Sequence, residues 1–225
     1  MVIFEGKNLS ILNKAGKLIL NNFSFAINAG EIWMAVGPNG IGKSSLWETL
    51  IGIGRLEKGQ LLLADKEITH LIPSERVRLG MSYIAQNCAL FDDISVENNL
   101  KMVAESLLPA SEHKQAVEKA IRVFWLESLA KKRPNQLSGG QRRRVELAKI
   151  IIGKAKLVLM DEPFAAVDEE YTEKTTAIFV NMKKNGVSFL VNDHNNAAVR
   201  KISDYCIHLG QTGHKNAVSI EKISK

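Results

Sequence analysis

The sequence predicts an α/β fold built on a mainly parallel β-sheet. From residue 32 to residue 209, short apolar stretches alternate with stretches of helical periodicity, which is typical of a parallel sheet with helices on both faces. A glycine-rich turn follows the first of these apolar stretches. Purely helical periodicity at about residues 95–152 predicts a helix-rich insert. With 225 residues and 45% apolar content, the chain can form a substantial core.

The N-terminal part is predicted to form β-strands ahead of the glycine-rich turn. Apolar and polar positions alternate there in short pieces, which is the period of a half-buried strand. Turn signals lie at Ala15-Gly16 and Ala29-Gly30. The strands are predicted at residues 2–4, 18–20, 23–26 and 32–36.

The turn at residues 37–44 fits the phosphate-binding loop pattern G-x-x-x-x-G-K-[ST]. Its glycines allow backbone N–H groups to point into one concavity, and the helix predicted at residues 43–50 adds the positive end of its dipole. Lys43 is expected to contact the outer phosphates and Ser44 to bind Mg²⁺. An ordinary flexible turn is the alternative, but it does not account for the flanking strand and helix. The residues assigned to this site are Gly37, Pro38, Asn39, Gly40, Ile41, Gly42, Lys43, Ser44 and Ser45.

The remaining elements follow in order. A strand is predicted at residues 59–63 and a short helix at 74–79, opened by Pro73. The next strand, at residues 81–85, ends on Gln86. After the helical insert, strands are predicted at residues 156–160, 187–191 and 205–209, with helices at 169–184 and 195–201 between them.

Two acidic residues end the apolar strand at residues 156–160. Asp161 and Glu162 follow it directly, and Pro163 cannot extend a central strand. Beside a phosphate-binding loop, a carboxylate at the end of a buried strand is expected to hold Mg²⁺, which assigns that role to Asp161. Adjacent strand residues point to opposite sides. Glu162 is therefore predicted to orient and deprotonate the attacking water. The alternative is two acids in a solvated turn.

A second glycine-containing segment, Leu137-Ser138-Gly139-Gly140-Gln141, precedes a helix that begins near residue 142. Ser138 and Gln141 match the capping box S-x-x-Q. Capping does not explain the two consecutive glycines, which suit close approach of the backbone to a ligand. A helix N-terminus with bare amides predicts a second anion site.

Composition and charge argue against several other classes of protein. The net charge is +6 and the pI is near 9.3, but the basic residues are dispersed, with the densest groups at 131–133 and 142–144, and no nucleic-acid-binding motif is found. A solvated surface partly facing anionic lipid is expected, with no nucleic acid partner. No apolar run could cross a bilayer and no secretory signal is found, which predicts a cytoplasmic protein. Cys88 and Cys206 predict neither a disulfide framework nor a zinc site.

These motifs, in this order and at about these spacings, resemble the nucleotide-binding subunits of ABC transporters over essentially the whole chain. The resemblance implies one domain: a P-loop NTPase core with an N-terminal antiparallel β-subdomain (about residues 1–87 and 153–225) and a helical signature subdomain (about 88–152). It implies ATP and Mg²⁺ as ligands. It also implies a head-to-tail homodimer in which Ser138, Gly139, Gly140 and Gln141 of one subunit close on the γ-phosphate held by the other.

The resemblance alone assigns three further residues. Gln86 matches the loop glutamine that touches Mg²⁺ and transmits nucleotide state to the membrane partner. Asp168 matches the loop that crosses the dimer interface, and His194 matches the switch histidine that contacts the γ-phosphate. The segment from Gln86 to Phe91 matches the region where transmembrane permease subunits dock. This implies a peripheral position on the cytoplasmic face of the inner membrane.

The chain departs from the family where adenine is usually stacked on an aromatic residue. The corresponding residues, 11–14, include no aromatic side chain. Leu12 offers an apolar face instead. We therefore expect GTP to compete with ATP better here than in relatives that have the aromatic residue.

Residues 137–146, 161–168 and 192–195 are similar to the ATPases that power lipopolysaccharide extraction from the inner membrane, with branched-chain amino acid import ATPases as near relatives. Asp92 and Asp93 stand where the lipopolysaccharide ATPases usually carry arginine. The leading hypothesis is an ATP-hydrolysing motor subunit that drives substrate movement through separate transmembrane subunits. The alternative is a soluble ABC ATPase that acts as an assembly or scaffold factor, as in iron–sulfur biogenesis, and has no membrane partner.

Overall fold

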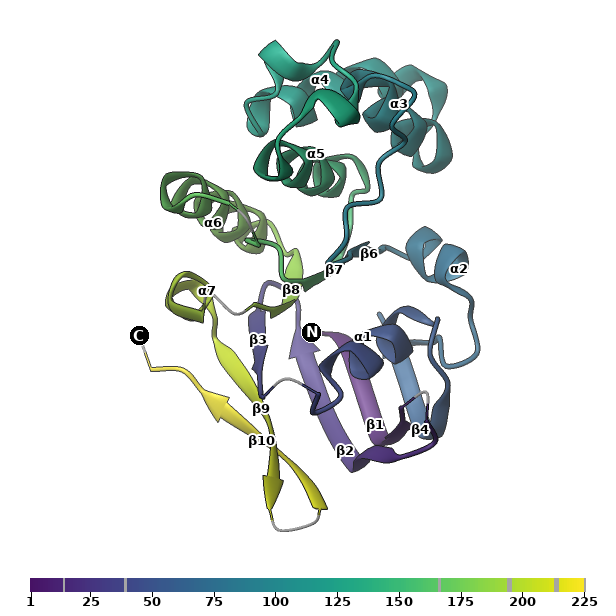
Figure 1. The fold of residues 1–225 in the computed structure, drawn as a ribbon. Coiled ribbons are helices and arrows are strands. Elements are labelled where there is room, and N and C mark those ends of the chain that lie inside the picture. The colour runs from purple at the N-terminus through teal and green to yellow at the C-terminus, as the bar shows by residue number, and fades with distance from the viewer. Residues whose placement is uncertain (14, 39, 166, 194–195, 213–214, 225) are drawn as a thin grey trace.

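The computed structural model describes residues 1–13, 15–38, 40–165, 167–193, 196–212 and 215–224. Its centre is a six-stranded sheet (Figure 1) in the order β10-β9-β3-β8-β7-β6. The five strands from β9 to β6 run parallel, and β10 is antiparallel to β9. The predicted parallel sheet is therefore confirmed. Its strands are β3 (Ile32–Val36), β6 (Met81–Ile84), β7 (Leu157–Asp161), β8 (Ser188–Asn192), β9 (Tyr205–Thr212) and β10 (Lys215–Lys222).

A second sheet is antiparallel and has the order β2-β1-β4-β5. It contains β1 (Val2–Leu12), β2 (Leu18–Asn28), β4 (Leu56–Leu63) and β5 (Lys66–Glu67). The pieces predicted separately at residues 18–20 and 23–26 form one strand, interrupted at Asn22, where φ is +54°. Asparagine tolerates this left-handed conformation better than most residues.

Helix α1 (Lys43–Ile51) lies between the two sheets. Leu46, Trp47 and Leu50 of α1 form one apolar core with β1, β2 and one face of the parallel sheet. The opposite face packs against α5 (Gly139–Ile152), α6 (Glu169–Lys184) and α7 (Asn196–Ile202). Because both faces are buried, β7 and β8 are apolar at odd and even positions alike, as the sequence analysis expected.

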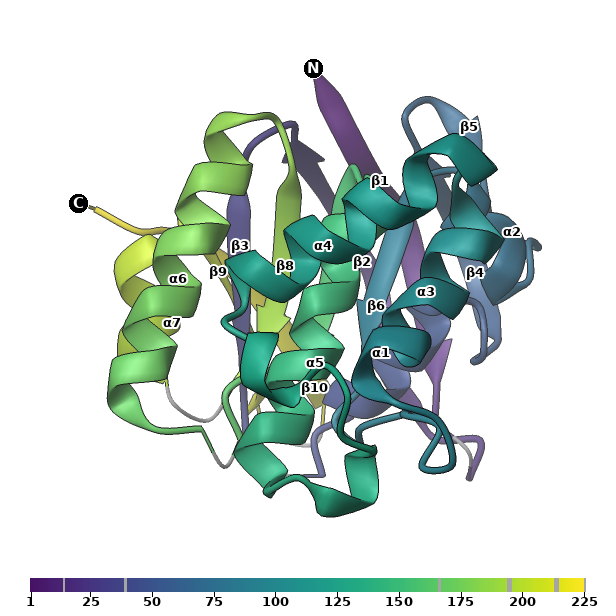
Figure 2. The ribbon, with the colours of Figure 1, turned by 90° about the horizontal axis from the view of Figure 1, so that it is seen from above.

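The helical insert contains α3 (Val96–Leu107), α4 (His113–Val123) and α5, which pack on one another. In Figure 1 these three helices stand above the parallel sheet, and Figure 2 shows α6 and α7 beside them. Short 3₁₀ turns at Ala110–Glu112, Glu127–Leu129 and Pro134–Gln136 connect them, and α2 (Pro73–Arg78) precedes β6. None of the described helices is both long and apolar enough to pass through a bilayer.

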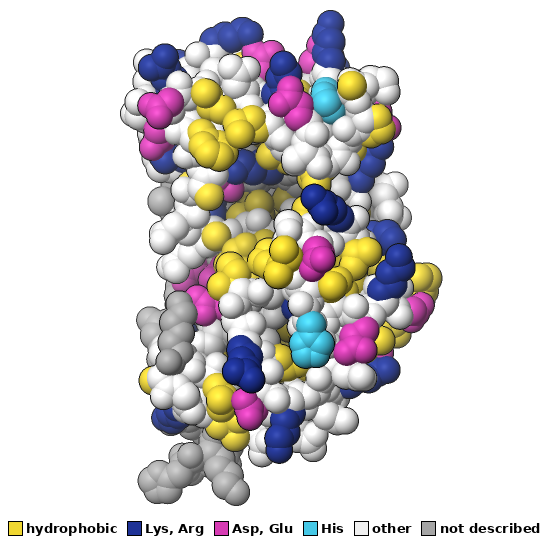
Figure 3. Space-filling view, turned by 90° about the vertical axis from the view of Figure 1, so that its right-hand side faces the viewer, with side chains coloured by type: hydrophobic (Ala, Val, Ile, Leu, Met, Phe, Trp, Pro, Cys, Tyr) yellow, Lys and Arg dark blue, Asp and Glu magenta, His cyan; other side chains and the backbone are white. Residues whose placement is uncertain are grey.

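The face drawn in Figure 3 carries basic side chains dispersed among acidic and hydrophobic ones, with a hollow between the helices of the insert and the rest of the chain. The interpretation of residues 142–144 as a solvated basic group is wrong for Arg143, which is buried. Arg144 donates to the carbonyl of Phe124 (3.1 Å), and Arg142 pairs with Asp92 (2.8 Å). These arginines therefore form contacts within the chain.

Candidate active site

The loops that follow β3, β6, β7 and β8 meet at the carboxyl edge of the parallel sheet. A pocket of about 420 Å³ lies there. Binding sites in parallel α/β sheets form at this edge because the strands end there together. The pocket is lined by Asn13, Gly40, Gly42, Lys43, Ser44, Ser45, Gln86, Asp161, Glu162 and Asn192.

The glycines of the 37–44 loop are required by its backbone path. Gly40 and Gly42 have φ values of +78° and +110°, which residues with a Cβ rarely adopt. A Cβ on Gly37 would lie 2.5 Å from the carbonyl oxygen of Leu209. Helix α1 begins after Gly42 without a side-chain cap or an acidic residue in its first turn. Its first N–H groups are therefore available to an anion.

Some of the other loop residues make contacts within the chain, and others line the pocket. Lys43 is 8% exposed, and its Nζ donates to the carbonyls of Gly37 (2.6 Å) and Pro38 (3.2 Å). Ser44 is exposed in the pocket, with Ser45 beside it. Ile41 packs its side chain into the apolar core. Asn39, also assigned to this loop, lies outside the described residues.

Asp161 ends β7 with a buried side chain. Its Oδ1 accepts a hydrogen bond of 2.6 Å from Nδ2 of Asn192, which ends the neighbouring strand β8. Burial raises the pKa of the Asp161 carboxyl; the hydrogen bond from Asn192 opposes this effect and the nearby charge of Glu162 adds to it. Asn192 was missed by the sequence analysis, since only the pairing of β7 with β8 shows that the two side chains meet.

The backbone turns sharply at Glu162, where φ is +51°. Its N–H donates to the carbonyl of Asn192 (2.6 Å), while its side-chain Oε2 accepts from Nε2 of Gln86 (3.0 Å). The two adjacent carboxylates thus have different partners, Asn192 for Asp161 and Gln86 for Glu162. Gln86, which the resemblance assigned, lies in the same pocket.

Arg143 of α5 is a site residue that the sequence analysis missed. It is 2% exposed, and its guanidinium donates to four backbone carbonyls at the ends of β6 and β7. These are the carbonyls of Ala85 (2.5 Å), Asp161 (2.9 Å), Glu162 (2.5 Å) and Pro163 (3.1 Å). One side chain of the helix that follows the Leu-Ser-Gly-Gly-Gln segment therefore fixes the backbone at the ends of both strands.

The predicted capping box is confirmed. Ser138 Oγ accepts from the Gln141 N–H (3.3 Å), and Gln141 Oε1 accepts from the Ser138 N–H (3.1 Å). A Cβ added to Gly139 would meet nothing within 4 Å, so packing within the chain does not require this glycine. The residues Ser138, Gly139, Gly140 and Gln141 are not among those described as lining the pocket.

Asp168 is exposed and caps α6, where its Oδ1 accepts from the Tyr171 N–H (2.8 Å). His194 lies outside the described residues. The preceding residue, Asp193, accepts a hydrogen bond of 3.0 Å from the Phe164 N–H. The loops after β8 and β7 are joined by this contact.

The segment after Gln86 exposes an aromatic ring. Phe91 is 60% exposed, whereas Asn99 of α3 is 2% exposed. Asn99 holds the Phe91 backbone by accepting from its N–H (2.8 Å) and donating to its carbonyl (3.0 Å). Asp92, the next residue, forms the ion pair with Arg142 on α5. The segment is therefore tied to two helices of the insert while the ring faces outward.

A second pocket of about 350 Å³ adjoins the first, with Asn13 and Ser45 lining both. Leu12, Glu48 and Ile53 also line it. Asn13 Oδ1 accepts from the N–H groups of Ala15 (3.0 Å) and Lys17 (2.9 Å), so its side chain is used by the turn between β1 and β2.

Comparison with known proteins agrees with this geometry. The family described as ABC transporter matches residues 20–165. The lipopolysaccharide export system ATP-binding protein LptB of Escherichia coli (strain K12) is 32% identical over 197 residues, covering 87% of this chain and 81% of that protein. The spermidine/putrescine import ATP-binding protein PotA of Bacillus thuringiensis (strain Al Hakam) is 31% identical over 208 residues, covering 92% and 62%.

Solved structures show the same fold. The dimeric structure of MJ0796, a bacterial ABC transporter cassette, has a TM-score of 0.86 at 21% identity, covering 99% of this chain and 100% of that one. CbiO1 of Clostridium perfringens, part of an ABC transporter complex, has a TM-score of 0.80 at 26% identity, covering 92% and 84%. The family match spans the 37–44 loop, the Leu137–Gln141 segment and the acid pair. This chain belongs to the ABC transporter family, as an ATP-binding subunit that hydrolyses ATP to power transport.

Proposed function

We propose that Mg²⁺ and the phosphates of ATP bind in the 420 Å³ pocket. The uncapped N–H groups of α1 and the Lys43 ammonium offer donors to the phosphates. Ser44, Gln86 and Asp161 offer oxygen ligands of the kind that Mg²⁺ prefers. The Asp161 carboxyl suits this role because a divalent cation offsets the cost of its buried charge. Bound Mg²⁺ would neutralise charge on the transferred phosphate.

In this proposal Glu162 is the general base. Its carboxylate takes the proton of the water that attacks the γ-phosphate, and Gln86 orients the carboxylate through their hydrogen bond. Arg143 acts as a positioning residue by holding the backbone of Glu162. His194 is proposed, from the family resemblance, to contact the γ-phosphate. The observation that carries the proposal is the meeting of Lys43, Ser44, Gln86, Asp161 and Glu162 in one pocket.

We propose that the site is completed by a second copy of the chain, bound head to tail. The residues Ser138, Gly139, Gly140 and Gln141 would contact the γ-phosphate held by the partner, and Asp168 would lie at the interface. The open surface over Gly139 supports this role, and the Ser138 hydroxyl caps only the N–H of Gln141 in the first turn of α5. In this view residues of about 88–152 form the subdomain that carries the segment toward the partner.

The exposed Phe91 ring is proposed to contact a transmembrane permease, which places the subunit on the cytoplasmic face of the inner membrane. The identity to LptB favours lipopolysaccharide export as the transport process. The soluble scaffold factor is the second candidate. The similarity to LptB and PotA, which are named as ATP-binding proteins of an export system and of an import system, favours the permease over the scaffold factor.

The test is to isolate the tagged Glu162→Gln protein from membranes in mild detergent with ATP and to identify its partners by mass spectrometry. Lipopolysaccharide-export permeases are expected. Recovery of a different pair of permeases would support the motor role but contradict lipopolysaccharide as the transported substrate. Recovery of soluble partners alone would favour the scaffold factor. In the same background, Phe91→Ser is expected to release the permease while ATP binding is kept. Ile72→Ser, which changes another exposed apolar residue (58% exposed), is the matched control.

A further inference from the structure

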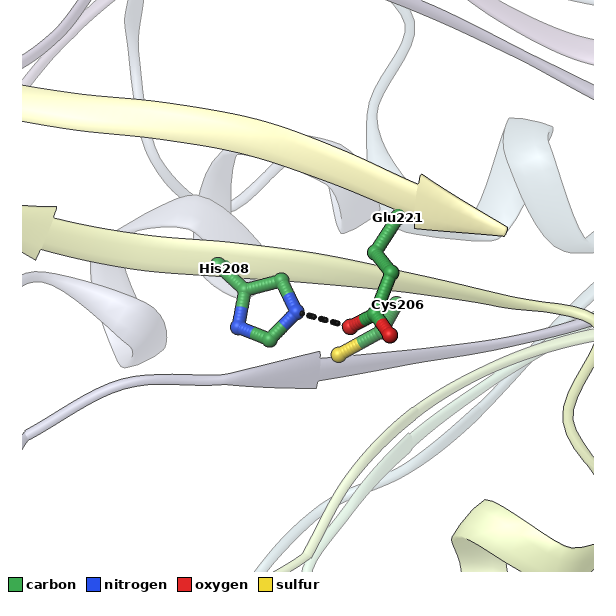
Figure 4. Close-up of side chains that lie close together, drawn as sticks. All are labelled: Cys206, His208 and Glu221. Carbon is green, nitrogen blue, oxygen red and sulfur yellow. Dashed lines mark hydrogen bonds and ion pairs between the residues drawn. The ribbon is translucent and has the colours of Figure 1, made fainter. Parts of the chain in front are cut away.

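Three metal-ligating side chains of different chemistry lie together on the hairpin of β9 and β10. They are Cys206 and His208 of β9 and Glu221 of β10, and their ligand atoms all lie within 4.8 Å of one another. Figure 4 shows the thiol, the imidazole and the carboxylate converging on one spot. They are not among the residues described as lining the nucleotide pocket, so the proposed ATPase function does not use them.

The pairing of the strands brings the three groups together. Cys206 is the direct cross-strand partner of Glu221. His208 follows Cys206 by two residues and therefore lies on the same face of the sheet. The backbone under the cluster is rigid because β9 is also paired with β3, Cys206 opposite Met34 and His208 opposite Val36. Cys206 and His208 therefore lie on a strand that is paired on both sides, and no loop has to become ordered before these two residues can bind a metal.

The cluster has a closed side and an open side. Cys206 is 0% exposed, whereas the side chains of His208 and Glu221 are 40% and 46% exposed. Nε2 of His208 and Oε2 of Glu221 are 2.8 Å apart. In a tetrahedral zinc site, bond lengths of about 2.0–2.3 Å place neighbouring ligand atoms about 3.3–3.7 Å apart. His208 and Glu221 would have to move slightly apart to reach this spacing, and their partial exposure leaves room for that movement.

We propose that Cys206, His208 and Glu221 bind one divalent transition-metal ion of the zinc class, with a water molecule as the fourth ligand. Sulfur, nitrogen and carboxylate donors together suit zinc, whereas Mg²⁺ and Ca²⁺ take oxygen ligands. Zinc binding would displace the thiol proton to solvent and form a sulfur–metal bond. The thiolate and the carboxylate would then balance the two charges of the ion.

A cation at this position would also lie near the positive charge of Arg200. This residue donates a hydrogen bond to the other carboxylate oxygen of Glu221, Oε1 (3.0 Å). This contact leaves Oε2 on the side of His208 and Cys206 and fixes the orientation of the carboxylate. Partners of this kind are common around metal ligands. The expectation that Cys206 has no zinc site rested on spacing along the chain, which does not reveal the cross-strand position of Glu221.

The test is a Co²⁺ titration of the tag-free, EDTA-treated protein without nucleotide, in a phosphine reductant, followed by displacement with Zn²⁺. We expect one equivalent of Co²⁺ to give the near-ultraviolet charge-transfer absorption of a thiolate–cobalt bond, and Zn²⁺ to abolish it. Cys206→Ser should remove the absorption. His208→Gln, at an exposed position, should weaken binding by at least about tenfold without changing the melting temperature of the metal-free protein.

Cys88→Ser and His70→Gln are the matched controls and should leave the titration unchanged. The proposal is overturned if the parent protein gives no thiolate–cobalt absorption, or if Cys88→Ser removes that absorption. It is also overturned if His208→Gln and Glu221→Gln bind Co²⁺ as tightly as the parent. The two variants at exposed positions decide the question even if Cys206→Ser fails to fold.

Discussion

Nε2 of Gln86 donates a hydrogen bond of 3.0 Å to Oε2 of Glu162. This contact joins the loop after β6 to the end of β7, which are 76 residues apart in the chain. The exposed ring of Phe91 lies five positions beyond Gln86 on the same segment. A displacement of this segment by a partner would therefore reach the carboxylate proposed as the base through a single hydrogen bond.

Glu162→Gln should abolish turnover while ATP binding is kept. The amide preserves the size of the side chain and can still accept from Gln86, but it cannot take a proton from water. Loss of a well-placed base costs about two to four orders of magnitude in rate. Phosphate release, equilibrium nucleotide binding and light scattering with ATP should show slow hydrolysis, normal binding and an accumulated dimer. Hydrolysis near the parent rate would refute the assignment; Glu127→Gln, at an exposed site, is the control.

Lys43→Ala should impair ATP binding, the step that precedes hydrolysis. Lys43 is 8% exposed and lies over the carbonyls of the phosphate-binding loop, so its removal takes away the ammonium group nearest the proposed phosphate site. Equilibrium binding of ATP should weaken by at least about tenfold, since charge-assisted hydrogen bonds contribute about 1.5–3 kcal/mol. Normal binding with lost hydrolysis would instead show that Lys43 acts only in the chemical step.

Arg143→Ala should destabilise the fold strongly. Four backbone carbonyls would lose their donor in a buried region, and we expect a cost of about 3–5 kcal/mol in the free energy of unfolding, measured by urea denaturation. Arg143→Lys should recover only part of the lost free energy of unfolding, because an ammonium group cannot reach all four carbonyl oxygens. Arg142→Ala, which removes the partly exposed pair with Asp92, should cost at most about 1 kcal/mol. Equal costs for Arg142→Ala and Arg143→Ala would contradict the role given to Arg143.

Local patterns predicted local structure well. The spacing of Ser138 and Gln141 predicted a capping box whose two hydrogen bonds the structure contains. The apolar runs ending at Val36 and Met160 predicted the buried strands, because both faces of that sheet are covered. These features depend on residues a few positions apart, which a single sequence displays directly.

Contacts between distant segments could not be predicted in the same way. The carbonyl partners of Arg143 lie 18 to 58 residues away in the chain, and Arg143 therefore looked like one of three surface arginines. Strand β10 was not predicted, because it is an edge strand, paired with β9 alone among the strands that the structure describes, and carries a weak apolar pattern. The juxtaposition of Cys206 with Glu221 follows from that pairing and was missed for the same reason.

Discrimination between ATP and GTP should be weak. Leu12, not an aromatic residue, lines the pocket beside Ser45, and stacking of a base on an aromatic ring is worth about 1–3 kcal/mol. Direct competition should show similar affinities for the two nucleotides. Leu12→Tyr adds a ring without disturbing the turn made by Asn13 and should tighten ATP binding several-fold, with Val2→Tyr, at an exposed position at the other end of β1, as the control. A strong preference of the parent for ATP would contradict this prediction.

Asp161→Asn should stabilise the nucleotide-free protein while abolishing Mg²⁺-dependent hydrolysis. The pKa of the buried Asp161 carboxyl is raised above its unfolded value, so the folded state holds its proton more tightly. Stability therefore falls as the pH rises from the unfolded pKa through the folded pKa, and the charged carboxylate opposes folding at neutral pH. Asparagine removes that charge and can still accept from Asn192.

We expect a gain of about 0.5–2 kcal/mol at pH 7, measured by urea unfolding. The gain should shrink as the pH is lowered through the raised pKa, because the parent then protonates Asp161 and loses the same charge. Asp93→Asn, at an exposed position, should show neither the gain in stability nor the loss of that gain at low pH. If Asp161→Asn were less stable than the parent at neutral pH, the carboxylate would be a stabilising group, and burial would not dominate its energetics.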